Sequence, residues 1–494
     1  MVTDPSQPAA SIDPAGTAAP APALSAQVRS VLAILMGSAF VMMLNETTVA
    51  VALPAVMADY AVSAATAQWL LTGFLLTMAV VMPTTGWMLE RFTTRAVFAA
   101  AVGSFLVGTV LAALAPTFAV LLLGRIGQGL GTAMLLPLML TVTMTLVPAE
   151  RRGSVMGVIA VVMAVGPALG PTVAGAVLAV TTWHGIFWIM VPLVAAAGIL
   201  GMMRLRNVST PVHVPLDVLS VLLSVVAFGG LVYGLSSIGI ILAGGSAALV
   251  AIGVSVAGAL GLALFVGRQL RLARTESALL DLRPLAVPGF TVPLIALLVL
   301  FAALLGVMNT LPLYLQGSLL ASALATGLVL MPGGLVETVL SPVAGRLFDR
   351  VGPRPVVIPG MVFAFGALAW LSTVDETTSV WQIALIHVVF SIGLAACLSP
   401  LMTAALGSLP APLYGHGSAI LNTAQQLAGA AGTAALIAIF SAVSEGSRSG
   451  GAAEAVALAD GAGTAFLVAA IAVAAAGVLS LGIGRKPPAQ TVAG

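Results

Sequence analysis

Long apolar stretches separated by short polar segments make up most of the chain between residues 30 and 483. A helix that crosses a bilayer needs about 20 consecutive apolar residues, and fourteen stretches come close to or exceed that length. They cover residues 30–52, 67–88, 96–115, 118–147, 152–180, 183–203, 216–237, 245–266, 290–315, 323–347, 354–372, 380–406, 417–443 and 462–483. The pattern therefore predicts an all-α polytopic membrane protein with fourteen transmembrane helices.

Composition excludes several other classes of protein. The 494 residues include only 18 Lys and Arg and 16 Asp and Glu, which is 7% of the chain, whereas 60% are hydrophobic. Soluble domains are about 25% charged, so this chain is not an ordinary soluble enzyme or a disordered protein. A single cysteine, Cys397, excludes an intrachain disulfide and a thiolate metal cage. The four histidines lack metal-ligand spacing, so we expect no metal site.

The positions of the basic residues predict the orientation. If both termini lie on one side, sixteen of the eighteen Lys and Arg fall in segments on that side, as the positive-inside rule requires of cytoplasmic loops. The excess of arginine over lysine and the abundant alanine are typical of a GC-rich bacterial genome. We therefore expect a multi-pass protein of the bacterial cytoplasmic membrane, with residues 1–28 and 485–494 as cytoplasmic tails.

Two ten-residue segments repeat. GWMLERFTTR (Gly86 to Arg95) and GRLFDRVGPR (Gly345 to Arg354) share a glycine, an acid four residues later and arginines five and nine residues later. Both connect a helix running inward to one running outward, which suggests two related six-helix halves. The predicted units are residues 29–206, an inserted helix pair at 207–267, an interfacial linker at 268–289 and a second half at 290–484. We expect two salt bridges in these loops, Glu90 with Arg91 and Asp349 with Arg350, to latch the halves together. The predicted latch comprises Gly86, Glu90, Arg91, Arg95, Gly345, Asp349, Arg350 and Arg354.

Several segments resemble one known family. The second repeated loop is similar to the signature loop of the major facilitator superfamily, and RIGQGLG around Arg125 is similar to its fourth-helix pattern. LNETTVAVALP (Leu44 to Pro54) resembles the first-helix signature of the 14-helix drug:proton antiporter branch, with the acid displaced from position 45 to Glu46. The antiporter motif of helix 5 is similar to GPALGP, which contains Gly166, Pro167, Gly170 and Pro171.

This resemblance implies two six-helix bundles plus two inserted central helices, and alternating access between the two sides of the membrane. It implies export of lipophilic or cationic drugs or natural products in exchange for protons. The alternative is a proton-linked importer or exporter of one specific metabolite. The chain carries no catalytic constellation, and its only lysine is terminal, which excludes an ATP-binding Walker A loop. We therefore expect no enzyme activity, no cofactor beyond a proton gradient, no nucleic-acid partner and function as a monomer.

Three ionisable residues fall inside predicted spans: Glu46, Arg125 and Glu337. Charges in a bilayer are costly and indicate function by default. At 1.5 Å per residue, Glu46 and Arg125 both lie about 10 Å below the outer boundary, and Glu337 lies about 20 Å deep. We predict that they act in proton coupling and substrate binding. The alternatives are a fixed Glu46–Arg125 ion pair, and a protonated Glu337 hydrogen-bonded to a neighbouring helix.

Neutral polar residues on the same helices could line a pathway for substrate. Their amides can donate and accept hydrogen bonds, although helix packing explains them equally well. The pore-lining candidates are Asn45, Gln128, Asn422, Gln425 and Gln426.

Overall fold

The structure is a computed structural model, and it describes residues 24–62, 64–67, 69–208, 211–212, 216–238, 241, 244–273, 278–321 and 323–484. In these ranges all regular secondary structure is helical, and thirteen helices are long and apolar enough to cross a membrane. The 27-residue helix α6 (Arg152–Leu178) brings the number to fourteen. The predicted all-α architecture is confirmed.

The helices fall into three groups along the chain. The first group is α1 (Ala26–Tyr60), the short α2 (Ala64–Ala67), α3 (Trp69–Arg91), α4 (Thr94–Ala113), α5 (Phe118–Leu146), η1 (Ala149–Arg151), α6 and α7 (His184–Arg204). The inserted group is α8 (Val218–Ser224), η2 (Val225–Gly229), α9 (Gly230–Ser236) and α11 (Gly245–Leu272). The last group is η4 (Arg283–Ala286), α12 (Pro288–Gly317), α13 (Ala323–Val351), α14 (Arg354–Leu371), α15 (Val380–Gly407), η5 (Ala411–Leu413), α16 (Tyr414–Ser449) and α17 (Glu454–Ser480).

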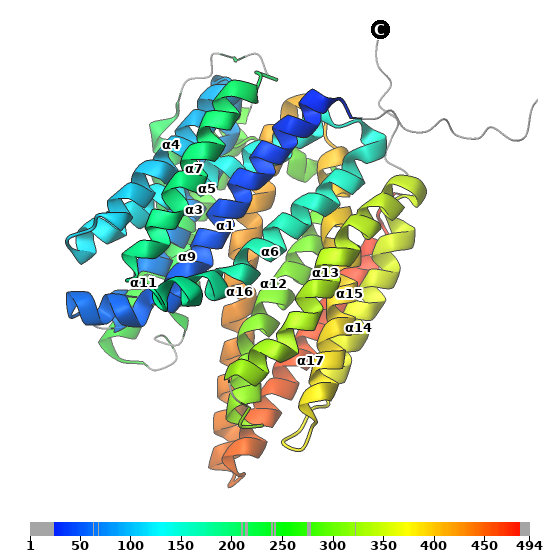
Figure 1. The fold of residues 1–494 in the computed structure, drawn as a ribbon. Helices are drawn as coiled ribbons and strands as arrows, with labels where there is room; N and C mark the ends of the chain where they lie inside the picture. The colour runs from blue at the N-terminus through cyan, green and yellow to red at the C-terminus, as the bar shows by residue number, and fades with distance from the viewer. Residues whose placement is uncertain are drawn as a thin grey trace, which may run out of the picture.

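The first and last groups form two bundles that meet at one end of the molecule. In Figure 1 the first group lies on the left and the last group on the right, and their lower ends lie apart. Helix α6 packs along α13, and α16 packs along α3, so one helix of each bundle reaches the other. We call the end where the bundles meet the arginine-rich end, because Arg29 lies in the first turn of α1 there, and Arg91 and Arg350 lie in the last turns of α3 and α13.

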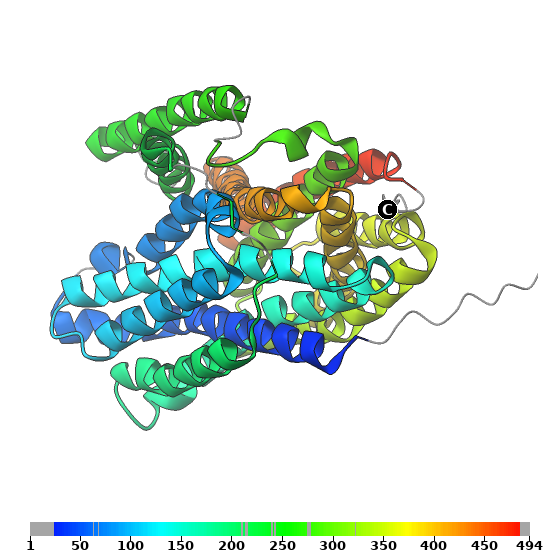
Figure 2. The ribbon, with the colours of Figure 1, turned by 90° about the horizontal axis from the view of Figure 1, so that it is seen from above.

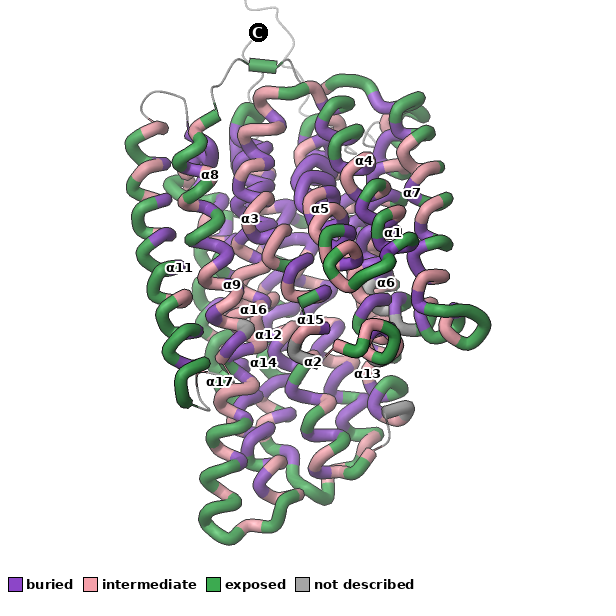
Figure 3. Tube along the Cα trace, turned by 90° about the vertical axis from the view of Figure 1, so that its left-hand side faces the viewer, coloured by how far each residue is buried: buried purple, intermediate pink, exposed green. Residues whose placement is uncertain are grey.

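The inserted helices lie at one edge of the molecule, beside α3 (Figure 2). Asp217 and Arg268 join their ends through a bidentate ion pair of 2.6 and 2.8 Å. Helix α11 is exposed along most of its length (Figure 3), as expected of a helix that faces lipid. The predicted span 216–237 is not one regular α-helix, because Val225–Gly229 forms a π-helical turn.

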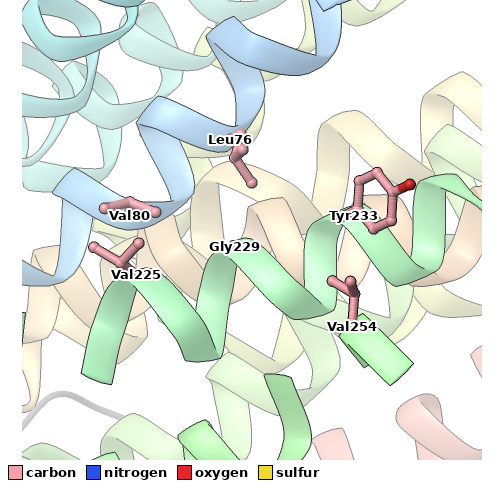
Figure 4. A pocket seen from close by; sticks show the side chains of 6 residues that line it. All are labelled: Leu76, Val80, Val225, Gly229, Tyr233 and Val254. Carbon is pink, nitrogen blue, oxygen red and sulfur yellow. The ribbon is translucent and has the colours of Figure 1, made fainter. Parts of the chain in front are cut away.

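A crevice of about 250 Å³ separates the inserted helices from α3 (Figure 4). Its lining is almost entirely apolar and consists of Leu76, Val80, Val225, Gly229, Tyr233 and Val254. The Tyr233 ring stacks on Trp69 with centroids 6.4 Å apart. Aromatic contact near the end of the crevice thus docks the inserted pair onto α3.

Small residues set how closely neighbouring helices approach. A Cβ atom on Gly108 of α4 would lie 2.7 Å from the backbone nitrogen of Gln128 on α5. On α6, a Cβ atom on Gly157 would lie 2.6 Å from the Ser341 carbonyl oxygen of α13. Close packing of this kind is typical of membrane helices, which gain contact where side chains are small.

Candidate functional site

A fully buried arginine lies at the centre of the first bundle. Arg125 on α5 donates from Nε to the Leu70 carbonyl at 3.1 Å, and from Nη1 to Asn45 Oδ1 at 3.0 Å and Gln128 Oε1 at 2.8 Å. Its guanidinium carbon lies 4.4 Å from the centre of the Phe74 ring. Three helices, α1, α3 and α5, thus hold one cation, which is the arrangement that a buried charge needs.

This network extends to a fourth helix and is not complete. Gln128 donates from Nε2 to the Thr109 hydroxyl of α4 at 3.0 Å. In the described part of the chain, Arg125 Nη2 and Asn45 Nδ2 are buried and have no hydrogen-bond partner. Two donors therefore remain available for an acceptor group on a bound molecule or water.

Glu46 is adjacent to this network but does not pair with it. The described residues form no hydrogen bond or ion pair within 4 Å between Glu46 and Arg125, and the side chain of Glu46 is half-buried. A direct Glu46–Arg125 ion pair, the predicted alternative, is therefore not formed in this conformation, and the role of Glu46 stays a prediction. Asn45 Oδ1 supplies the acceptor for Arg125, and Glu46 has no hydrogen-bond or ion-pair partner among the described residues.

Glu337 lies in the other bundle, on α13. Among described residues it makes no hydrogen bond or ion pair, and it is half-buried. No such contact joins it to Glu46 or Arg125 either. The structure therefore places the two acids on different bundles, and either can change its charge without breaking a salt bridge.

A buried histidine near Glu337 is not predicted as a site residue by the sequence, because the four histidines lack the spacing of metal ligands. His387 on α15 is 3% exposed, and its Nδ1 has no hydrogen-bond partner among the described residues. Its ring lies against Gly333 of α13, where a Cβ atom would lie 2.7 Å from His387 Nε2 and 2.5 Å from Ser391 Oγ. Gly333 is one helical turn from Glu337, so this site contains a second titratable group. The sequence features that could have indicated this group are the glycine pair Gly333-Gly334 after Pro332 and the single histidine of the span 380–406.

The predicted pore-lining residues of α16 lie close to the interface between bundles. Asn422 and Gln425 are buried, and Gln426 is half-buried. Asn422 Nδ2 donates to the Ser418 carbonyl of its own helix at 2.8 Å. The Ser418 hydroxyl accepts from Thr141 of α5 at 3.3 Å. Helix packing accounts for these contacts, and pore lining by the three amides stays a prediction.

The acid of the second repeated loop binds the other bundle. Asp349 accepts hydrogen bonds from the Gly153 nitrogen at 2.7 Å, the Ser154 nitrogen at 2.8 Å and the Ser154 hydroxyl at 2.5 Å. These are the free N–H groups of the first turn of α6, where a negative charge also favours the helix dipole. The expected Asp349–Arg350 salt bridge does not occur, and Asp349 instead caps a helix of the first bundle.

The acid of the first repeated loop makes an equivalent contact in the opposite direction. Glu90 lies 2.9 Å from Nε2 of His416, in the first turn of α16. His416 Nδ1 accepts from the Asp281 nitrogen at 3.2 Å, so Nε2 is the nitrogen that donates to Glu90. Glu90 therefore pairs with His416 rather than with Arg91. A Cβ atom on Gly86 would lie 2.5 Å from His416 Nδ1, which explains the glycine at the start of this loop.

The last arginine of each repeated loop bonds within its own bundle. Arg95 Nη2 donates to the Met202 carbonyl near the end of α7 at 2.7 Å. Arg354 donates to the carbonyls of Leu481 and Ile483, which follow α17. A cation is favoured at a helix C-terminus. These two residues, expected in the latch, instead tie the third helix of each bundle to its last helix, and their equivalence supports the internal repeat.

The glycines of the GPALGP segment allow α6 to contact α1. A Cβ atom on Gly166 would lie 2.9 Å from Met43 Cβ, and one on Gly170 would lie 3.1 Å from the Leu44 carbonyl oxygen. The helix continues through Pro167 and Pro171, whose side chains are outside the described part of the structure. One end of α6 thus packs on α13 of the other bundle, and the other end packs on its own bundle.

Comparison with known proteins identifies the family. Residues 35–433 match the family model of the Major Facilitator Superfamily. The chain is 40% identical to the lincomycin resistance protein LmrB of Listeria monocytogenes over 412 residues, which is 83% of this chain and 86% of that protein. It is 39% identical to LmrB of Bacillus subtilis over 416 residues, or 84% and 86% of the two chains.

Solved structures show the same fold at low sequence identity. A mutant of XylE superposes with a TM-score of 0.66 at 14% identity, covering 94% of this chain and 98% of that one. The human organic anion transporter MFSD10 gives a TM-score of 0.63 at 15% identity, covering 92% and 99%. The chain therefore belongs to the major facilitator superfamily and is a multi-pass membrane transporter, not an enzyme.

Proposed function

We propose that this protein exports lipophilic or cationic drugs or natural products across the bacterial cytoplasmic membrane in exchange for protons. The observation that carries the proposal is a pair of membrane carboxylates, Glu46 and Glu337, which lie on different bundles and have no salt-bridge partner among the described residues. Each can bind a proton when its surroundings are dry and release it when a cation or water approaches.

The names of the relatives support the substrate class. Proteins named for resistance to lincomycin share 39–40% of their residues with this chain, and a protein of Mycobacterium tuberculosis named as a multidrug resistance protein B homolog shares 29% over 79% of the chain. Lincomycin is therefore the first substrate to test.

Transport would proceed by alternating access. The contacts of Asp349 with α6 and of Glu90 with His416 hold the arginine-rich end closed, while the lower ends of the bundles lie apart (Figure 1). With the orientation that the arginines predict, this is an outward-facing conformation. Breaking the two contacts would let the bundles rock and open the cytoplasmic side.

The direction of coupling can be tested without knowing how the protein is oriented in a vesicle. An antiporter gathers its substrate in the acidic compartment, whereas a symporter gathers it in the alkaline compartment. We expect proteoliposomes with an acidic lumen to accumulate radiolabelled lincomycin, and a protonophore to abolish the accumulation. Protein-free liposomes control for passive trapping.

The two acids are tested in the same assay. We expect Glu46→Gln and Glu337→Gln each to reduce gradient-driven accumulation at least about tenfold, because a neutral amide cannot exchange a proton. Accumulation in the alkaline lumen would instead favour the specific importer. Unchanged accumulation in both variants would remove these acids from the mechanism.

A further inference from the structure

A second crevice opens at the arginine-rich end, where the two bundles touch. Its volume is about 270 Å³, and it is bordered by α1 and α6 of the first bundle and α13 of the second. Arg29 of α1 and Arg346 of α13 line it together with apolar side chains. Of the residues in the contacts described above and in the proposed transport mechanism, only Ser154 lines it.

In this crevice the charged side chains lie near the membrane surface, and the apolar side chains lie deeper in the membrane. On α1 the lining residues Arg29, Leu32, Ala33 and Met36 have the spacing of one helix face. Met36 lies seven positions after Arg29, so the apolar part of this face reaches about 10 Å from the arginine into the bilayer.

The lining residues of α13 and α6 also change from polar at the surface to apolar deeper in the membrane. On α13, Pro342 lies one turn deeper than Arg346, because this helix runs toward the arginine-rich end. On α6, the lining residues Val155 and Val158 lie deeper than Ser154. All three helices therefore present a polar group at the membrane surface and an apolar group below it.

Unlike other arginines at this end, the two arginines of the crevice have no partner in the part of the chain that the structure describes. Arg95, Arg152 and Arg354 donate to backbone carbonyls. Within the described residues Arg29 and Arg346 make no hydrogen bond or ion pair. Asp349, the acidic residue closest in sequence to Arg346, already accepts hydrogen bonds from backbone amides of α6.

We propose that this crevice binds one anionic phospholipid, with its phosphate between Arg29 and Arg346 and an acyl chain along Leu32, Met36 and Val158. The planar guanidinium fork suits phosphate oxygens, and basic sites between membrane helices bind acidic headgroups. Because each bundle supplies one arginine, the bound lipid stabilises the conformation in which α6 and α13 are in contact. This inference requires only the membrane location, and it stands whether or not the protein exchanges protons.

The test is native mass spectrometry of the purified, detergent-solubilised protein with added phosphatidylglycerol. We expect wild type to retain phosphatidylglycerol under conditions that strip phosphatidylcholine, and Arg29→Gln/Arg346→Gln to retain about tenfold less or lower. The matched control is Arg204→Gln/Arg271→Gln, which removes two exposed arginines from the same end outside the crevice. This control is expected to bind lipid like wild type, and thermal unfolding curves verify that all variants are folded.

Three results would overturn the proposal. One is equal phosphatidylglycerol retention in the Arg29/Arg346 variant and wild type. Another is equal retention of phosphatidylcholine by wild type, which would mean that the headgroup charge is not recognised. The third is loss of phosphatidylglycerol on addition of millimolar inorganic phosphate at constant ionic strength, which would assign the arginines to a free anion.

Discussion

At the scale of single residues, the first bundle is organised by Arg125. Sequence placed Arg125 and Glu46 at one depth, but successive residues of a helix point about 100° apart. Asn45 rather than Glu46 therefore faces the guanidinium. The depth of a residue could be predicted from the sequence, whereas its direction depends on how α1 is rotated in the bundle, which only packing determines.

Arg125→Lys is expected to impair both stability and transport. A lysine ammonium cannot reach the acceptors on Leu70, Asn45 and Gln128 together, and each lost buried hydrogen bond costs about 1–3 kcal/mol. Thermal unfolding in detergent and gradient-driven uptake both measure the effect. Arg271→Lys, at an exposed position of α11, is the control and is expected to unfold like wild type. An unfolding temperature for Arg125→Lys equal to that of wild type would refute the importance of this network.

The glycine pair on α13 gives a second residue-scale prediction. Gly333→Ala places a methyl group against His387 and Ser391 and is expected to destabilise the protein by about 1–3 kcal/mol. Gly334→Ala is the matched control, because nothing lies within 4 Å of its added Cβ. The unfolding temperatures of the two variants, measured side by side, test this prediction. Equal unfolding temperatures would show that His387 does not require the space beside Gly333.

At the scale of elements, each repeated loop places an acid at the first turn of a helix in the other bundle. The repeat itself was visible in the sequence, but its partners were not predicted. The local ion pairs expected from adjacent charges did not form, since Asp349 binds the free N–H donors at the start of α6 and Glu90 pairs with the side chain of His416.

Asp349→Ala is expected to open the arginine-rich end. It removes three hydrogen bonds between the bundles, and the population should shift by about tenfold for each 1.4 kcal/mol lost. The single cysteine, Cys397, can be replaced so that spin labels at the exposed residues Phe92 and Val351 report the distance between the two loops.

We expect the Phe92–Val351 distance distribution to gain a longer component in Asp349→Ala. A label pair at Phe92 and Met203, both on the first bundle, controls for local distortion and should not change. Identical distributions in wild type and Asp349→Ala would show that Asp349 does not hold the closed end.

The ion pair of the inserted helices gives a prediction about pH. The hydrogen bonds from Arg268 lower the pKa of Asp217 to about 2, although burial acts in the opposite direction. A lowered carboxyl pKa contributes stability that is present above the unfolded-state pKa near 4 and is lost as pH falls toward 2. Corrected hydrogen-exchange protection of α8 should therefore be constant from pH 5 to 8.

Asp217→Asn removes the charge-assisted bonds and is expected to reduce protection of α8 at every pH in that range. Protection of α14, far from the inserted helices in the sequence, provides the internal reference. A steep pH dependence in wild type between pH 5 and 8, or unchanged protection in Asp217→Asn, would contradict this account of the ion pair.

At the scale of the whole molecule, hydrophobic patterning predicted the helices well because a bilayer leaves few other structures for the backbone. The predictions were wrong where hydrophobicity does not determine the type of helix or the residue at which a helix begins. The π-turn at Val225–Gly229 has no sequence signature, and α17 begins at Glu454 although its first turns carry acids. The crevice between α1, α6 and α13 could not be predicted, because it depends on the tilt of helices from two bundles. The orientation in the membrane remains a prediction from the arginines.

The central claim is that substrate and proton compete for the membrane acids. Its most direct test is the pH change of a weakly buffered solution of detergent-solubilised protein when the antibiotic probe is added. We predict proton release on binding by wild type, and binding with little or no release by the Glu46→Gln/Glu337→Gln variant. Saturable binding of the probe to wild type without any proton release would contradict the account.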